Sequence, residues 1–86
     1  MEDPYGIIYY PYVTEKTMDL MEKNNSLVFM VRREATKQQI KRAIEEMFDV
    51  KVEKVNTKIT KNGKQAIVKF HPDYRAEEIG MRIGVF

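Results

Sequence analysis

The sequence predicts an α+β fold: a single, mostly antiparallel four-stranded sheet with packed helices, ferredoxin-like in outline. Apolar residues recur with helical spacing behind Thr36, Asn62-Gly63 marks a hairpin, and the elements follow the order strand, helix, strand, helix, strand, strand, helix. The second and third strands, joined by the long helix, should run parallel, with the fourth antiparallel between them as a split βαβ unit. Because 86 residues hold one core, residues 1–86 are expected to form a single domain.

The first half of the chain predicts a strand, a helix and a second strand. Ile7 to Tyr10 is a short apolar run closed by a proline, as expected of an edge strand. Thr14 is a suitable N-cap and Asn24-Asn25 a suitable left-handed stop for a helix over about 15–24. Leu27 to Val31 is an unbroken apolar run, so both faces of this strand should be covered.

The clearest helix starts at Thr36. Thr36 and Gln39 have the spacing of a capping box. Behind them the apolar residues follow a helical period, which defines the face that packs on the sheet: Ile40, Ala43, Ile44, Met47 and Phe48. Near the end of the chain, Asp73 is expected to cap a last helix that stops at Gly84.

The hairpin signal also predicts a register. A two-residue type I′ loop at Asn62-Gly63 places Ile59 opposite Ala66 and gathers the apolar residues of both strands, Ile59 included, on the core face. A bulge is expected near Glu53-Lys54, where the apolar pattern changes phase. The other face is then polar and holds Lys54, Asn56, Lys58, Thr60, Gln65, Ile67, Lys69 and His71.

Positive charge is concentrated in two segments, although 15 basic and 13 acidic residues leave a net charge of only +2. Residues 32–42 sum to +4 and residues 51–70 to +5. Such runs are often plain solvated surface, but lysines interspersed with hydrogen-bonding side chains also suit RNA, with charge for phosphates and polar groups for sugars and bases. The basic RNA-binding candidates in these segments include Arg33, Lys37, Lys41, Lys54, Lys58, Lys64 and Lys69. Five tyrosines either stack on bases or pack in the fold.

Several classes of function have no support in the sequence. The single histidine, His71, and the single serine, Ser26, would have to meet to form a catalytic dyad, and cysteine is absent. No glycine-rich phosphate loop or metal-ligand spacing is present, so neither enzymatic activity nor a cofactor, metal or small-molecule substrate is expected. The lack of cysteine and of a leader-like or membrane-spanning run predicts a cytoplasmic location.

Three segments, Tyr10 to Lys16, Ala35 to Glu45 and Phe48 to Thr57, resemble the universal large-subunit ribosomal protein L twenty-three family in order and spacing. The resemblance runs from about residue 9 to the end. The short hairpin loop and the ending from Glu78 to Phe86 are similar to the archaeal branch in particular. Gly80, where relatives often have alanine, is a departure that weakens the last helix.

The resemblance implies a structural constituent of the large ribosomal subunit that binds large-subunit rRNA beside the polypeptide exit tunnel. Implied partners are the neighbouring ribosomal protein numbered twenty-nine, the signal recognition particle, the translocation channel and the nascent polypeptide. Bacterial relatives extend a long hairpin loop into the tunnel, which this chain lacks. The family's RNA-facing motifs fall here on Thr14, Glu15, Lys16, Thr36, Lys37, Lys41, Asn56 and Thr57.

Two other classes of function fit a domain of this size less well. An acylphosphatase-type enzyme has a similar size and architecture but needs glycines and an arginine after its first strand, where this chain has Pro11 to Thr14. A regulatory or oligomerisation module without RNA would expose an apolar face, whereas the hairpin here is expected to expose lysines.

Overall fold

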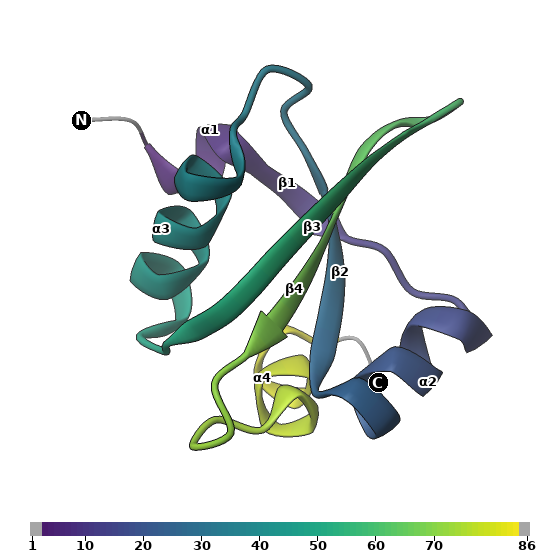
Figure 1. Cartoon of the computed structure of the whole chain (residues 1–86), viewed down its shortest axis with the longest axis vertical. Helices are drawn as coiled ribbons and strands as arrows, with labels where there is room; N and C mark the ends of the chain where they lie inside the picture. The colour runs from purple at the N-terminus through teal and green to yellow at the C-terminus, as the bar shows by residue number, and fades with distance from the viewer. Residues whose placement is uncertain (1–2, 85–86) are drawn as a thin grey trace.

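The computed structural model describes residues 3–84, which fold into four helices and four strands (Figure 1). The outermost residues of the predicted domain, 1, 2, 85 and 86, lie outside this range. No helix within 3–84 has the length and apolar character needed to cross a membrane. The helices are α1 (Pro4–Ile7), α2 (Glu15–Asn24), α3 (Lys37–Phe48) and α4 (Ala76–Ile83), and the strands are β1 (Ile8–Pro11), β2 (Ser26–Val31), β3 (Val52–Thr60) and β4 (Gly63–Phe70).

The strands form one sheet in the order β1-β2-β4-β3, and each neighbouring pair is antiparallel. Because β2 and β3 both run antiparallel to β4, which separates them, they run parallel to each other. This confirms the predicted α+β fold with its split βαβ arrangement. It also confirms that the proline-terminated first strand lies at an edge of the sheet, where a missing N–H group leaves no ladder partner unsatisfied.

The hydrophobic core lies between the sheet and α3 and continues to α4 and Met21 of α2. Phe29 of β2 stacks on Phe48 of α3 with ring centroids 6.1 Å apart. Figure 1 shows α3 and α2 on opposite sides of the strands, with α4 near α2 at one end of β2. All of β2 is buried, so the prediction that both faces of this strand are covered is confirmed.

Capping boxes start α2 and α3, which confirms the predicted N-cap at Thr14 and the predicted capping box at Thr36. Thr14 Oγ1 accepts a hydrogen bond from the Thr17 amide at 3.2 Å, and Thr17 Oγ1 accepts one from the Thr14 amide at 2.7 Å. Thr36 and Gln39 form the same reciprocal pair. Asn25 ends α2 in the left-handed conformation (φ 53°), which confirms the predicted stop.

Two local expectations are wrong. Pro4–Ile7 forms the short helix α1, whose start is capped by Asp3, so Ile7 belongs to a helix and not to the first strand. Asp73 does not cap α4, which has Arg75 at its N-cap position and no side-chain cap from that residue. The Ala76 amide at the start of α4 instead donates to Oδ1 of Asn25 at 2.7 Å.

The hairpin has a different register from the predicted one. Thr60 lies opposite Gly63, so the loop is Lys61-Asn62 and not Asn62-Gly63. A type I′ turn needs positive φ at both loop residues, whereas here positive φ occurs only at Gly63 (126°), just after the loop. The predicted irregularity near Glu53-Lys54 is present, as a register shift between Val52 and Lys54.

The shift in register is even, so every side chain of the hairpin keeps its predicted face. Ile59 lies opposite Lys64 and not opposite Ala66. It is 56% exposed, which means that the predicted burial of Ile59 in the core is wrong. The far end of the hairpin extends beyond the helices that cover the core face.

Ile59→Ala is therefore expected to lower the free energy of unfolding by less than about 0.5 kcal/mol, as for other exposed positions. Phe70→Ala, which empties a site only 1% exposed, should cost about 3–5 kcal/mol. Urea denaturation of both variants measures the difference. Similar losses for the two would mean that Ile59 packs in the core after all.

Candidate nucleic-acid interface

The outer face of β3 and β4, here called the open face, carries most of the hairpin's polar side chains. Alternation along β3 points Lys54, Asn56 and Lys58 to this side, and all three are exposed. Their partners across the strand pair are Lys69, Ile67 and Gln65, so Lys69 shares the same surface. The structure thus brings together four of the predicted RNA-binding residues.

One of these lysines has an acidic neighbour. Lys69 Nζ lies 3.7 Å from Glu53 Oε1, and both side chains are close to half exposed. A pair exposed to this degree contributes at most about 1 kcal/mol. Lys69 can therefore exchange this partner for a phosphate at small cost.

The start of α2 lies across a groove from the open face. Thr14, Glu15 and Lys16 are on its α2 side, and Lys58 is on its hairpin side, so the structure brings these predicted site residues together. The groove has a volume of about 670 Å³ and is lined by Tyr12, Thr14, Glu15, Lys16, Thr17, Leu20, Val28, Lys58, Thr60, Lys61, Asn62, Gln65 and Ile67.

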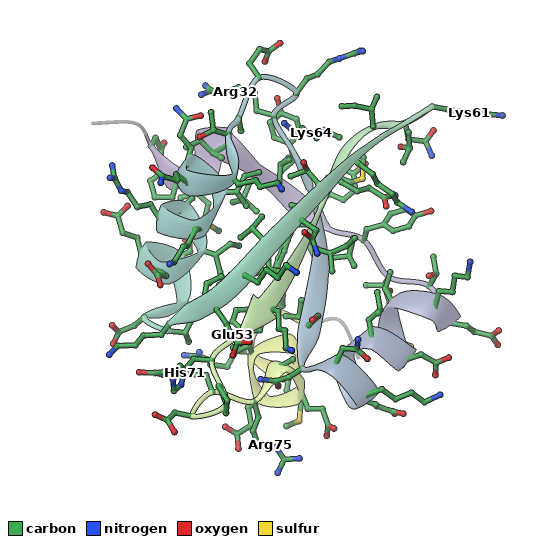
Figure 2. All side chains as sticks on the ribbon, viewed as in Figure 1. Arg32, Glu53, Lys61, Lys64, His71 and Arg75 are labelled. Carbon is green, nitrogen blue, oxygen red and sulfur yellow. The ribbon has the colours of Figure 1, made fainter. Side chains whose placement is uncertain are left out.

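The groove suits an anionic ligand. Its lining residues include Lys16, Lys58 and Lys61 and a single acidic residue, Glu15. The positive end of the α2 dipole and the first-turn amides that the capping box does not use add to the attraction for anions. Figure 2 shows Lys61 at the far tip of the hairpin, directed away from the body of the protein.

The remaining basic candidates form a second surface on the other side of the sheet, around the start of α3. Arg33, Thr36, Lys37 and Lys41 are all exposed there. Lys41 also borders a small hollow of about 260 Å³ with Gln38, Arg42 and Glu45. Most of the predicted site residues therefore lie on two separate surfaces.

Two candidates belong to neither surface. Thr57 is half-buried and points to the same side of β3 as Val55, opposite to Asn56. Lys64 Nζ donates hydrogen bonds to the Ala35 carbonyl at 2.7 Å and the Arg33 carbonyl at 3.4 Å. Lys64 thereby ties β4 to the loop before α3, next to Arg32 in Figure 2.

Gln65 lines the groove but is not among the residues predicted to bind RNA. The alternation of side chains along β4 places Gln65 on the polar face of the hairpin, but Gln65 is only 7% exposed. β4 lies between β2 and β3, so neighbouring side chains cover Gln65 from both directions. The position of this strand inside the sheet was the signal that could have predicted its burial.

The tyrosines divide in the same way between surface and fold. Tyr5, Tyr9 and Tyr10 are exposed by 71%, 56% and 53%, whereas Tyr74 packs against the core. Tyr12 is half-buried and lines the groove. It is the tyrosine placed closest to the predicted RNA-binding residues of α2.

Comparisons with known proteins agree with this picture. The model of the family described as "Ribosomal protein L23" matches residues 6–79. The large ribosomal subunit protein uL23 of Methanobrevibacter smithii is 52% identical over 85 residues, which cover 98% of this chain and 99% of the relative. The uL23 proteins of Methanothermobacter thermautotrophicus and Thermoplasma acidophilum are 48% and 56% identical and cover 98% and 93% of this chain, and 99% and 95% of their own length.

Proposed function

Because the chain belongs to the ribosomal protein L23 family, whose members are structural and not enzymatic, we propose that it binds large-subunit rRNA through the open face and the adjoining groove. The archaeal relatives confirm the archaeal resemblance, and membership of the family makes the chain a component of the large ribosomal subunit. Binding of rRNA through this interface is proposed here in addition to the family membership.

The observation that supports this interface is the convergence of two segments far apart in the sequence. Lys58 of β3 and Lys16 of α2 line one groove, and Lys54 and Asn56 are exposed beside Lys58 on the same face of β3. Exposed lysines supply phosphate contacts and the intervening amides supply hydrogen bonds to sugars and bases. The second surface, around the start of α3, is proposed to contact a different rRNA segment or a neighbouring protein.

Binding to an archaeal large-subunit rRNA fragment should weaken steeply as salt rises, because each lysine–phosphate contact releases counterions. With four or more contacts, the slope of log affinity against log salt concentration is expected to be about −3 or steeper. Filter binding at several potassium concentrations measures this slope. An affinity that does not change with salt would contradict an interface based on phosphate contacts.

The position on the ribosome follows from the resemblance to the family. We place the chain beside the polypeptide exit tunnel of a cytoplasmic ribosome, next to the protein numbered twenty-nine. There it would help to form the docking site for the signal recognition particle and the translocation channel. The short Lys61-Asn62 connection supports a location at the tunnel rim, since it leaves no loop that could extend into the tunnel.

A photo-crosslinker at Asn62 tests this location, because Asn62 is exposed at the tip of the hairpin. On ribosomes stalled with nascent chains of increasing length, crosslinks are expected only once the chain is long enough to approach the exit. A crosslinker at Met81, 60% exposed on α4, serves as a comparison for general surface contacts. Efficient crosslinks from position 62 to much shorter chains would place the hairpin inside the tunnel and overturn the proposal.

A further inference from the structure

Gln65 is a largely enclosed residue whose side-chain amide has no partner among the described residues and is still open to the groove. It is 7% exposed, and among residues 3–84 no group forms a hydrogen bond with its side-chain amide. The side chain lines the groove between α2 and the hairpin. Because the amide is not fully buried, its donors and its acceptor remain available to a ligand that enters the groove.

The surroundings of Gln65 in the groove are largely apolar. Val28, Leu20 and Ile67 line the same groove, and Tyr12 adds an aromatic ring at its wall. Such a lining favours a flat, partly apolar group, and the amide of Gln65 offers it one acceptor and two donors. The volume of about 670 Å³ lies within the range of roughly 300–1,000 Å³ that is typical of small-ligand sites.

The mouth of the groove provides groups of a different kind. Lys16 and Lys58 border it from opposite sides, and the capping box of α2 uses the amides of Thr14 and Thr17 but not those of Glu15 and Lys16. These donors suit a phosphate. Glu15, on the same rim, would repel a cluster of phosphates, but its carboxylate can accept a hydrogen bond from a ribose 2′-hydroxyl.

Resting on the rRNA-binding function proposed above, we infer that the groove holds one unstacked nucleotide of the rRNA and that Gln65 recognises its base. The phosphate lies at the α2 start between Lys16 and Lys58, and the base enters the apolar part of the groove. Only an unpaired base reaches such a site, because a paired base stays stacked inside the A-form helix and cannot enter a groove in the protein.

The test compares Gln65→Met with the parent chain. Methionine has a similar shape and no polar group, so the variant should unfold at the same temperature or higher. Its affinity for the rRNA fragment should fall about tenfold, the usual effect of losing one amide–base contact. Because glutamine is uncharged, the salt slope should not change, whereas Lys58→Gln should reduce that slope by about 0.7–0.9.

An azidophenylalanine at Tyr12 locates the nucleotide, with the same substitution at the exposed Tyr5 as control. Position 12 should crosslink to one unpaired nucleotide, and removing the base of that nucleotide should weaken binding by the parent chain but not by Gln65→Met. Equal affinities of the parent chain and Gln65→Met, or crosslinks from position 12 to paired rRNA, would overturn the inference and leave the rRNA-binding function intact. A parent chain that binds no rRNA would overturn both.

Discussion

Replacing Lys16, Lys54 and Lys58 together by glutamine is expected to weaken binding to the large-subunit rRNA fragment about a hundredfold. A contact between a lysine and a phosphate is worth roughly 1 kcal/mol at the surface, and three independent contacts add. The salt slope should also become shallower by about two to three. All three side chains are exposed, so the free energy of unfolding should change by less than about 0.5 kcal/mol per site.

A matched control removes the same charge from the other side of the sheet. The triple variant Arg33→Gln, Lys37→Gln and Lys41→Gln changes the net charge equally and also affects exposed residues. A loss of affinity that depended only on net charge would be the same in both variants. A larger loss from the α3-side triple would show that the second surface, and not the open face, is the main rRNA contact.

The topology was predictable because several independent patterns agreed. The capping box of Thr36 and Gln39 fixed the start of α3, and the unbroken run from Leu27 to Val31 indicated an internal strand. A long helix between two strands then leaves room for the last strand between them, as observed for β4. The fold of such a sequence can be predicted because its local propensities agree with its global fold.

The hairpin register was not predictable from its strongest signal. Asn-Gly is compatible with a type I′ loop, but glycine also serves just after a two-residue loop, where Gly63 has φ 126°. Both registers keep the apolar side chains on one face, so the pattern of β3 and β4 cannot distinguish them. Nor does a strand pattern show where its covering helices end, which is why Ile59 was expected in the core.

The candidate site was predictable along each strand but not between elements. Alternation along β3 alone predicts that Lys54, Asn56 and Lys58 lie on one face of the strand. It also predicts that Asn56 and Thr57 lie on opposite faces, although the family motif contains both. The approach of α2 to the hairpin depends on tertiary packing, so the groove and the burial of Gln65 emerge only in the folded chain. The short helix α1 did have a local signal, since Asp3 precedes Pro4 as an N-cap precedes proline at N1.

Asn25→Ala is expected to lower the free energy of unfolding by about 4 kcal/mol, because it removes a side chain that joins three parts of the fold and strains the end of α2. Asn25 Oδ1 accepts from the Ala76 amide at 2.7 Å, and its Nδ2 donates to the Tyr74 and Phe70 carbonyls at 2.8 and 3.2 Å. Alanine loses all three bonds, each worth about 1 kcal/mol. It also fits poorly in the left-handed conformation that ends α2.

Asn25→Gly separates these two contributions. Glycine adopts φ 53° without strain, so this variant loses only the hydrogen bonds and should be less destabilised than Asn25→Ala by about 1 kcal/mol. Hydrogen exchange adds a local measurement, since the Ala76 amide should lose protection in both variants. If Asn25→Ala unfolds within about 1 kcal/mol of the parent chain, or if the Ala76 amide keeps its protection, then α4 is held to the sheet by its buried side chains Ala76 and Ile79 and not by Asn25.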